Sequence, residues 1–177
     1  MKRIIGTVST TLLAGAMMFG VSNLSVHADD SQPYKVVIPG KNKEKPVTIG
    51  FNTQKELETY KKKHPINPDF PKTFQSLSQI STTYYHDSNL QGTKFNVNAS
   101  RSPIVIKNLD NSDNDKVSSI LTHPFGNYTM IYEHTNAQGR ALAIVNNGGY
   151  LNLSTISMGD GERTWDDQIS STTVQSN

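Results

Sequence analysis

The feature that most constrains the fold of this chain is an internal repeat. A polar hexad, Asn-Asp-Lys-Val-Ser-Ser at residues 114–119, returns as Asp-Asp-Gln-Ile-Ser-Ser at residues 166–171. An upstream octad repeats as well: residues 85–92 and 132–139 share Tyr, Asn, Gln and Gly at matching positions. Self-similarity with a period in this range indicates a duplicated supersecondary unit, whose copies pack together to bury one core.

The two repeats differ in spacing, and the difference locates an insertion. The octads lie 47 positions apart (85 to 132) and the hexads 52 (114 to 166), so the second unit carries about five extra residues. We expect them near the Gly-Asp-Gly stretch at residues 159–161, because glycine and aspartate are frequent in turns.

Residues 81–177 have the pattern of short strands in both units. The β-prone runs lie at residues 82–85, 94–98, 103–106, 117–121, 128–132, 140–145, 150–153 and 169–174. Short strands separated by regular turn signals predict an all-β sandwich or barrel. Each unit supplies about four strands, so the two units together give about eight, enough to bury a core.

Residues 29–80 are predicted to be a spacer or pro-segment outside this β domain. Residues 29–46 are rich in Lys and Pro and poor in large apolar side chains, which favours an extended or disordered chain. A wall-proximal stalk is a further interpretation of the segment.

A short strand followed by a helix is expected within this segment. The strand would span residues 47–51, and Asn52 or Thr53 would cap a helix that runs to about Lys63. Glu56 stands three residues after Thr53, which is the spacing of a capping box. The helix is predicted to end at His64-Pro65, because proline cannot continue it.

The first 28 residues have the pattern of a secretory signal peptide. A basic start at Lys2 and Arg3 precedes an apolar stretch over residues 4–21, and small residues at 26–28 suit cleavage after Ala28. An uncleaved membrane anchor is the alternative. No other segment approaches the ~20 apolar residues of a membrane span. We therefore expect a secreted protein of the Gram-positive kind, with no membrane span in the mature chain.

Charge and cysteine content exclude several classes of function. Two of the 17 basic residues lie in the signal segment, which leaves 15 basic against 15 acidic residues. No basic patch for nucleic acid is expected from this balance. Residues 79–177 carry six basic and nine acidic residues, a mildly acidic domain of the kind that binds cations. The absence of cysteine excludes disulfides, cysteine zinc sites and catalytic thiols.

The repeated residues resemble the signature of a known family. A Tyr followed at fixed spacing by Gly, and then by Asn/Asp-Asn/Asp-x-x-Ser/Thr-Ser, is similar to the βγ-crystallins and in particular to their calcium-binding microbial branch. The resemblance covers two Greek-key motifs, at about residues 82–124 and 127–177. Leu90 and Ala137 stand where many members carry a second aromatic residue, and the second unit is longer.

The resemblance implies two calcium sites, each built from both motifs. The family uses the side chain at the second hexad position, the carbonyl at the third, the hydroxyl at the fifth and a hairpin carbonyl from the other motif. Carried over, one site takes Asp115, Lys116 (carbonyl), Ser118 and Thr135, and the other Asp167, Gln168 (carbonyl), Ser170 and Ser88, with Asn114 and Asp166 in support. The alternative is a calcium-blind fold in which the hexads are capped turns.

Competing chemistry finds less support in the sequence. Residues 111–116 resemble the start of an EF-hand loop, but Lys116 stands where that loop needs Gly and Thr122 where it needs Glu. The carboxylates at residues 160–167 would suit a glycosidase pair but are typical of a solvated face or an ion site. Trp165 is expected to anchor the core, with an exposed sugar platform as the alternative.

We therefore expect a secreted, non-enzymatic βγ-crystallin-like protein that binds Ca²⁺ at two sites and is stabilised by it. One alternative is an extracellular protease inhibitor or killer-toxin-like protein that presents residues 158–163 to a protein partner. Another is a cell-wall or carbohydrate-binding module.

Overall fold

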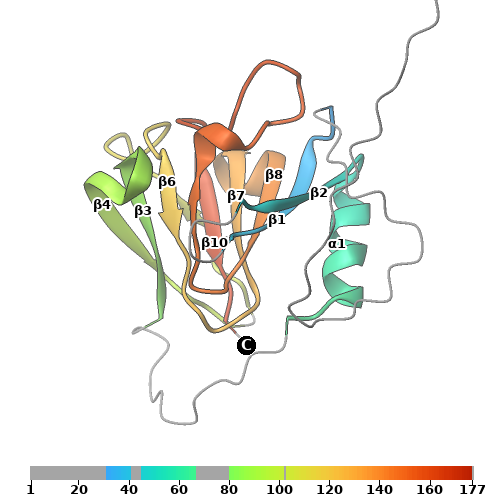
Figure 1. Ribbon diagram of the computed structural model, residues 1–177. Helices are drawn as coiled ribbons and strands as arrows, with labels where there is room; N and C mark the ends of the chain where they lie inside the picture. The colour runs from blue at the N-terminus through green and yellow to red at the C-terminus, as the bar shows by residue number, and fades with distance from the viewer. Residues whose placement is uncertain (1–30, 41–44, 67–79, 102, 177) are drawn as a thin grey trace, which may run out of the picture.

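The computed structural model describes residues 31–40, 45–66, 80–101 and 103–176 (Figure 1). The predicted signal peptide at residues 1–28 lies outside them. The described elements are β1 (Tyr34–Ile38), β2 (Val47–Phe51), α1 (Gln54–Lys63), β3 (Ser81–Asp87), η2 (Ser88–Leu90), β4 (Gln91–Asn98), β5 (Lys107–Asn108), β6 (Ser119–Leu121), β7 (Tyr128–His134), η3 (Thr135–Ala137), β8 (Gln138–Val145), β9 (Tyr150–Asn152), η4 (Leu153–Thr155) and β10 (Ser171–Val174).

Two sheets form a sandwich in which each repeat unit lends one strand to the other. The first sheet has the order β4-β3-β6-β9 and the second β2-β1-β8-β7-β10-β5. Strand β5 of the first unit thus lies in the second sheet, and β9 of the second unit lies in the first. Thr82 and Thr129, which are 47 positions apart, bond to each other through their hydroxyls at 2.7 Å, as equivalent residues near a local twofold axis would. The predicted sandwich of two Greek-key motifs is confirmed.

The main core fills the space between the two sheets. Trp165 is 1% exposed there, with Tyr84 and Ile120 fully buried beside other large apolar side chains. Fully burying one such side chain stabilises the fold by about 1.5–3 kcal/mol. Trp165 is therefore the predicted core anchor, and the interpretation of it as an exposed sugar platform is wrong.

Within the segment predicted as a spacer, the described residues 31–40 and 45–66 instead pack on the sandwich. Strand β1 pairs in parallel with β8 and antiparallel with β2, which extends the second sheet at its edge. Both faces of β1 are covered, since Val37 packs in the main core and Val36 in a second core beneath the helix. Residues 29–46 gave no such signal, because three consecutive apolar residues at 36–38 between Lys- and Pro-rich flanks look like a loop.

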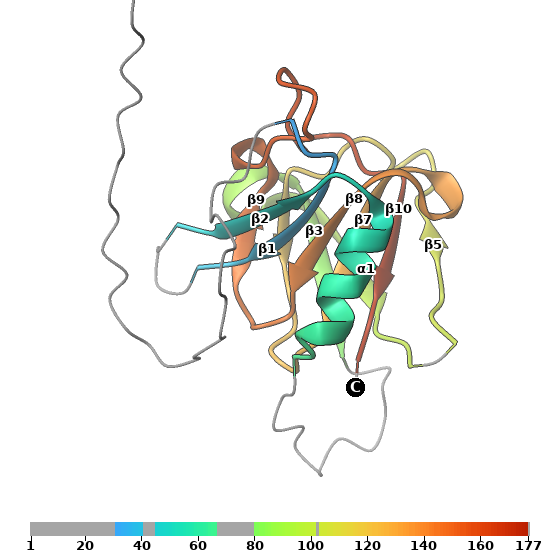
Figure 2. The same ribbon diagram turned by 90° about the vertical axis from the view of Figure 1, so that its right-hand side faces the viewer.

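Helix α1 covers the outer face of the second sheet (Figure 2). Its start is the predicted capping box: Thr53 Oγ1 accepts the Glu56 N–H at 3.2 Å, and Glu56 Oε2 accepts the Thr53 N–H at 3.2 Å. Leu57 is fully buried and Tyr60 packs on Phe51, with ring centroids 5.2 Å apart. The helix is not long and apolar enough to cross a membrane, and no other helix among the described residues is.

The strand expected at residues 103–106 does not form. Ile104, Val105 and Ile106 are 50%, 62% and 46% exposed in an irregular segment, and only Lys107 and Asn108 pair, as β5 with β10. The segment crosses from the first sheet to the second, so its backbone leaves both ladders. β-propensity alone does not report such a crossing.

Candidate metal centre

Both units close their first hairpin with the same three-residue turn, η2 in one and η3 in the other. Each holds an asparagine in left-handed backbone, Asn89 at φ 59° and Asn136 at φ 58°. Gly92 and Gly139 follow at φ 75° and 79°, a region that a Cβ disfavours. This backbone conformation explains why glycine recurs at the same position of both copies.

The serine at the sixth hexad position fastens each turn. Ser119 Oγ donates to the Asp87 carbonyl at 2.6 Å and accepts the Leu90 N–H at 3.0 Å. Ser171 makes the same two bonds to η3, at 2.6 and 3.1 Å. The hexads therefore do serve their own hairpins, through the last serine of each.

Each turn is also bonded to the opposite unit. The Asn152 side chain accepts the Asn89 N–H and donates to the Asn89 Oδ1, both at 2.8 Å. Asn108 makes the same two bonds to Asn136, at 2.7 and 2.8 Å. These amide pairs fix the turn of one unit against the strand that the other unit lends to its sheet.

The two hexads lie side by side and exchange backbone hydrogen bonds. The Asp115 N–H donates to the Ile169 carbonyl and the Asp167 N–H to the Val117 carbonyl, both at 3.1 Å. Both aspartates have positive φ, 52° and 53°. Aspartate tolerates this region better than most residues, yet the conformation still costs on the order of 1–3 kcal/mol. Strained backbone of this kind clusters at functional sites.

The fifth-position serine of one hexad faces the carboxylate of the other. Ser118 Oγ donates to Asp167 Oδ1 at 3.1 Å. The family resemblance groups Ser118 with Asp115 and Asp167 with Ser170, whereas this hydrogen bond joins Ser118 to Asp167 across the two predicted sites. The reason is the side-by-side packing of the hexads, which no spacing within one hexad reports.

The first-position residues of the hexads are in different states. Asn114 Nδ2 donates to Asp115 Oδ2 at 2.7 Å, which holds the neighbouring carboxylate. Asp166 has a buried Oδ1 with no hydrogen-bond partner among the described residues. A buried carboxylate oxygen without a partner is costly, and a cation would compensate it.

The third-position side chains are occupied elsewhere. Lys116 Nζ donates to the carbonyls of Asn111 and Ser112, both at 3.1 Å. Gln168 Nε2 donates to the Asp167 carbonyl at 2.8 Å. Of the remaining predicted residues, Ser88 and Thr135 begin the turns η2 and η3, and Ser170 precedes β10.

A side-chain contact that the sequence did not predict ties each hairpin to the loop before its hexad. In the first unit His86 Nε2 lies 3.0 Å from Asp113 Oδ1. At the equivalent place in the second unit Glu133 Oε1 lies 3.0 Å from Arg163 Nη2. The repeat could have indicated this, because positions 86 and 133 are 47 apart and both carry chargeable side chains.

The second pair belongs to a larger network of four charges. Arg140 Nη1 contacts both Glu133 carboxylate oxygens at 3.1 Å, and Arg163 Nε donates to Asp160 Oδ2 at 2.7 Å. Partial burial raises the pKa of Glu133, but the Arg140 N–H and the two guanidinium groups outweigh burial and leave the pKa lowered. The Arg163 backbone N–H, with its side chain, lowers the pKa of Asp160. Asp160 is therefore already paired with arginine, which argues against a glycosidase role.

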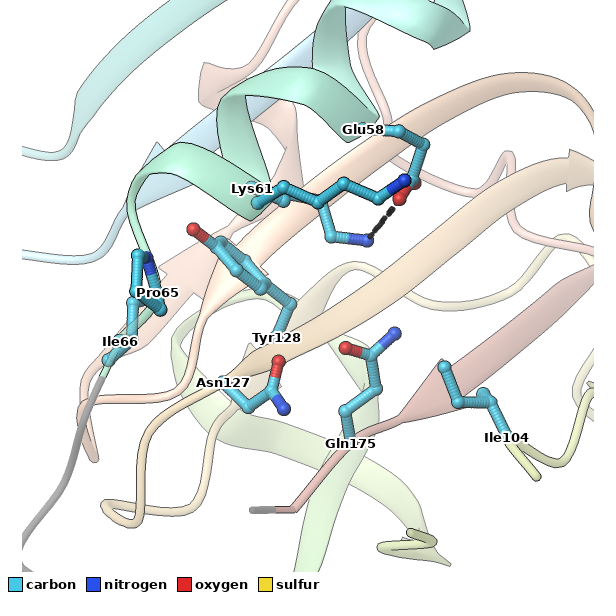
Figure 3. A pocket seen from close by; sticks show the side chains of 9 residues that line it. Glu58, Lys61, Pro65, Ile66, Ile104, Asn127, Tyr128 and Gln175 are labelled. Atoms are coloured by element: carbon cyan, nitrogen blue, oxygen red, sulfur yellow. Dashed lines mark hydrogen bonds and ion pairs between the residues drawn. The ribbon is translucent and has the colours of Figure 1, made fainter. Parts of the chain in front are cut away.

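A separate groove lies beside helix α1 (Figure 3). It encloses about 240 Å³ and shares no residue with the hexads or the hairpin turns. Lys61 bonds to Glu58 at 3.1 Å and lies 5.4 Å from the Tyr128 ring centroid. Two of the three charged side chains that line the groove, Glu58 and Lys61, thus pair with each other on the helix, which favours a structural role for them.

The described residues contain no group of three or more His, Cys, Asp or Glu side chains placed to hold a metal ion. The oxygen atoms at the hexads come instead from single carboxylates, serine hydroxyls and backbone carbonyls. Hydroxyls, carboxylates and carbonyls are hard ligands, the kind that calcium takes from several places in a fold.

Two solved structures are similar to this chain. One, described as "Evolution of the eye lens beta-gamma-crystallin domain fold", is 21% identical, with a TM-score of 0.44 over 55% of this chain and 86% of that one. The other, a βγ-crystallin from an archaeon, is 22% identical, with a TM-score of 0.38 over 53% and 95%. No protein-family model and no curated protein matches the sequence. The assignment of the fold rests on the sheet topology and internal repeat of this chain.

Proposed function

We propose that this chain is a secreted, non-enzymatic βγ-crystallin-like protein that binds two calcium ions and is stabilised by them. The single observation that carries the proposal is the exchange between the hexads, in which Ser118 of one bonds to the Asp167 carboxylate of the other at 3.1 Å. A capped turn requires hydrogen bonds only within its own repeat unit. A metal site shared between the units requires side chains of the two hexads to lie together, as Ser118 and Asp167 do.

The crossing defines the two sets of ligands in the proposal. One set is Asp167, the Gln168 carbonyl, Ser118 and the Ser88 hairpin. The repeat gives the second set: Asp115, the Lys116 carbonyl, Ser170 and the Thr135 hairpin. Asn114 and Asp166 support them, and the partnerless Asp166 Oδ1 is the atom that most needs a cation.

Calcium would act through thermodynamic linkage. An ion that binds only the folded chain adds about 2.7 kcal/mol per site when its concentration is ~100 times Kd. This is a large part of the ~5–15 kcal/mol that stabilises a typical domain. The chain has no disulfide that could stabilise it in this way.

Calorimetric titration with CaCl₂ tests the proposal. The expected result is saturable heat with two ions per chain, and much weaker heat with MgCl₂, because magnesium needs near-ideal octahedral geometry. Absence of heat together with an unchanged hydrogen-exchange pattern at the hexads would return them to the role of capped turns.

The alternative of a protein-binding loop has one observation in its favour. The insertion at residues 157–164 projects from the end of the sandwich (Figure 1), and residues 160–163 at its tip are exposed. Arg163 and Asp160 hold the loop closed, which is the rigidity a loop-presenting inhibitor needs. Inhibition assays against extracellular proteases test it, and Asp160→Ala would be expected to weaken any inhibition.

A further inference from the structure

The insertion in the second unit folds back onto hexad 166–171 through one side chain. Its ends pair as a bridge between Ser157 and Thr164, and the Met158 N–H donates to the Arg163 carbonyl at 2.9 Å. Arg163 is thus the last exposed residue of the loop, next to the closing bridge, and its side chain reaches back to the hexad. The first unit has no such insertion, and among the described residues no arginine bonds to the third position of hexad 114–119, where Lys116 donates to the carbonyls of Asn111 and Ser112 instead.

Arg163 holds three partners in three different segments. Its Nε donates to Asp160 Oδ2 at 2.7 Å and its Nη2 to Glu133 Oε1 at 3.0 Å. Its Nη1 donates to Gln168 Oε1 at 3.2 Å. A planar guanidinium suits this arrangement because its donors point in fixed directions, whereas a lysine offers a single charged point.

The bond to Gln168 continues into the backbone of the hexad. Gln168 uses its other amide atom, Nε2, to donate to the Asp167 carbonyl at 2.8 Å. Asp167 is the residue with φ 53° whose carboxylate accepts the Ser118 hydroxyl. A continuous chain of bonds therefore runs from Arg163 through Gln168 to the strained peptide that aims the Asp167 carboxylate.

We propose that Arg163 is a positioning residue for the cation site that contains Asp167, and that it makes the two sites unequal in affinity. The inference rests on the proposed calcium function. Partners in the outer shell of a metal site commonly contribute 10–100-fold in affinity by orienting the ligands. The site with Asp115 has Lys116 in place of Gln168 and lacks this brace.

Because Arg163 is positively charged, the sign of the affinity change on replacing it distinguishes a positioning role from simple charge repulsion. A nearby positive charge repels an incoming cation, so removing it without other change tightens binding. The carboxylates of Asp160 and Glu133 already offset that charge. Replacing Arg163 also leaves those carboxylates less compensated, which favours a cation. The proposal ranks the loss of the brace above this electrostatic gain, and so predicts weaker binding when Arg163 is replaced.

The test is calorimetric calcium titration of the full chain carrying Arg163→Gln, Gln168→Ala or both. Each single variant is expected to weaken one of the two sites about tenfold and leave the other unchanged. The double variant is expected to match the singles, because both changes cut the same chain of bonds. Faster hydrogen exchange at the Asp167 amide in ion-free protein is the accompanying readout.

Arg140→Gln is the matched control. It removes an arginine of the same network that bonds to Glu133 but makes no bond to Gln168, so both affinities are expected to be unchanged. If Arg163→Gln leaves both calcium affinities at their wild-type values, or raises either of them, the inference is wrong and the calcium function is unaffected. Absence of binding in the wild type overturns the calcium function itself, a distinct result.

Discussion

Ser118 and Asp167 are the residues on which the proposed two-site arrangement depends, and single substitutions can test their pairing. Ser118→Ala and Asp167→Ala are both expected to remove or weaken the same calcium site, since their side chains bond to each other. Combining them should therefore cost no more than Asp167→Ala alone, whereas Ser118→Ala with Asp115→Ala should impair both sites. Ion stoichiometry by calorimetry is the measurement. Loss of both sites in Ser118→Ala/Asp167→Ala would restore the grouping first expected from the sequence.

His123 should make stability depend on pH. Its ring is 4% exposed, Nδ1 accepts the Phe125 N–H at 3.2 Å, and Nε2 is left to donate to the Gln175 carbonyl at 3.1 Å. Burial lowers the pKa of this histidine despite the Gln175 bond. The unfolded chain, with a histidine pKa of about 6.5, then binds the proton more readily than the folded chain.

Stability should therefore be lost as the pH falls through about 6.5 and towards the lowered folded pKa, and regained above it. His123→Gln should flatten this part of the profile, and His134→Gln, at an exposed turn, should leave it unchanged. Urea denaturation between about pH 5 and 8 is the measurement. A slope that persists in His123→Gln would assign the pH dependence to another group.

At the residue scale, the sequence predicted the ingredients of the site better than their assembly. The hexads, the turn glycines and the fastening role of serine follow from comparing two copies within one chain. The bond between Ser118 and Asp167 does not, because it depends on how the copies pack. The role of Arg163 lies in the insertion, which has no second copy for comparison.

At the scale of elements, helix α1 offers the clearest test of local stability. Thr53→Ala removes the acceptor of the capping box and should lower the free energy of unfolding by about 1 kcal/mol. Leu57→Ala should cost about 2–5 kcal/mol, because it leaves a cavity in the fully buried contact with the sheet. Thr59→Ala, an exposed threonine of the same helix, serves as the control in denaturant unfolding. Equal effects of all three changes would mean that the helix is not docked.

The helix was predictable and strand β1 was not, for a physical reason. Local rules determine a capping box and an i, i+3 apolar stripe, so residues 53–63 could be assigned from neighbours in sequence. Strand β1 owes its place to parallel pairing with β8, more than a hundred positions away. At residues 104–106 the local signal predicts a strand that does not form. The β-propensity there is high, but the segment is exposed and has no neighbouring strand to pair with where it crosses between the sheets.

At the scale of the molecule, the segment that precedes the repeats and forms β1, β2 and α1 covers one face of the sandwich. Tyr128, Met130 and Val145 of that face are buried in the second core, together with Val36 of β1 and Leu57 of α1. A chain without residues 29–66 is expected to expose this apolar face, and hence to bind a hydrophobic dye and to self-associate. Light scattering and dye fluorescence are the measurements. A monomeric truncated chain that binds no dye would restore the interpretation of this segment as a spacer.

The central claim, that calcium stabilises this fold through sites shared between the two units, is tested most directly by thermal unfolding in calcium and in chelator. One saturated site adding about 2.7 kcal/mol corresponds to a rise in Tm of roughly 5–10 °C for a chain of this size. The account predicts that rise in the wild type and its absence in Asp115→Ala/Asp167→Ala. Equal Tm values for the wild type in saturating calcium and in chelator would contradict it.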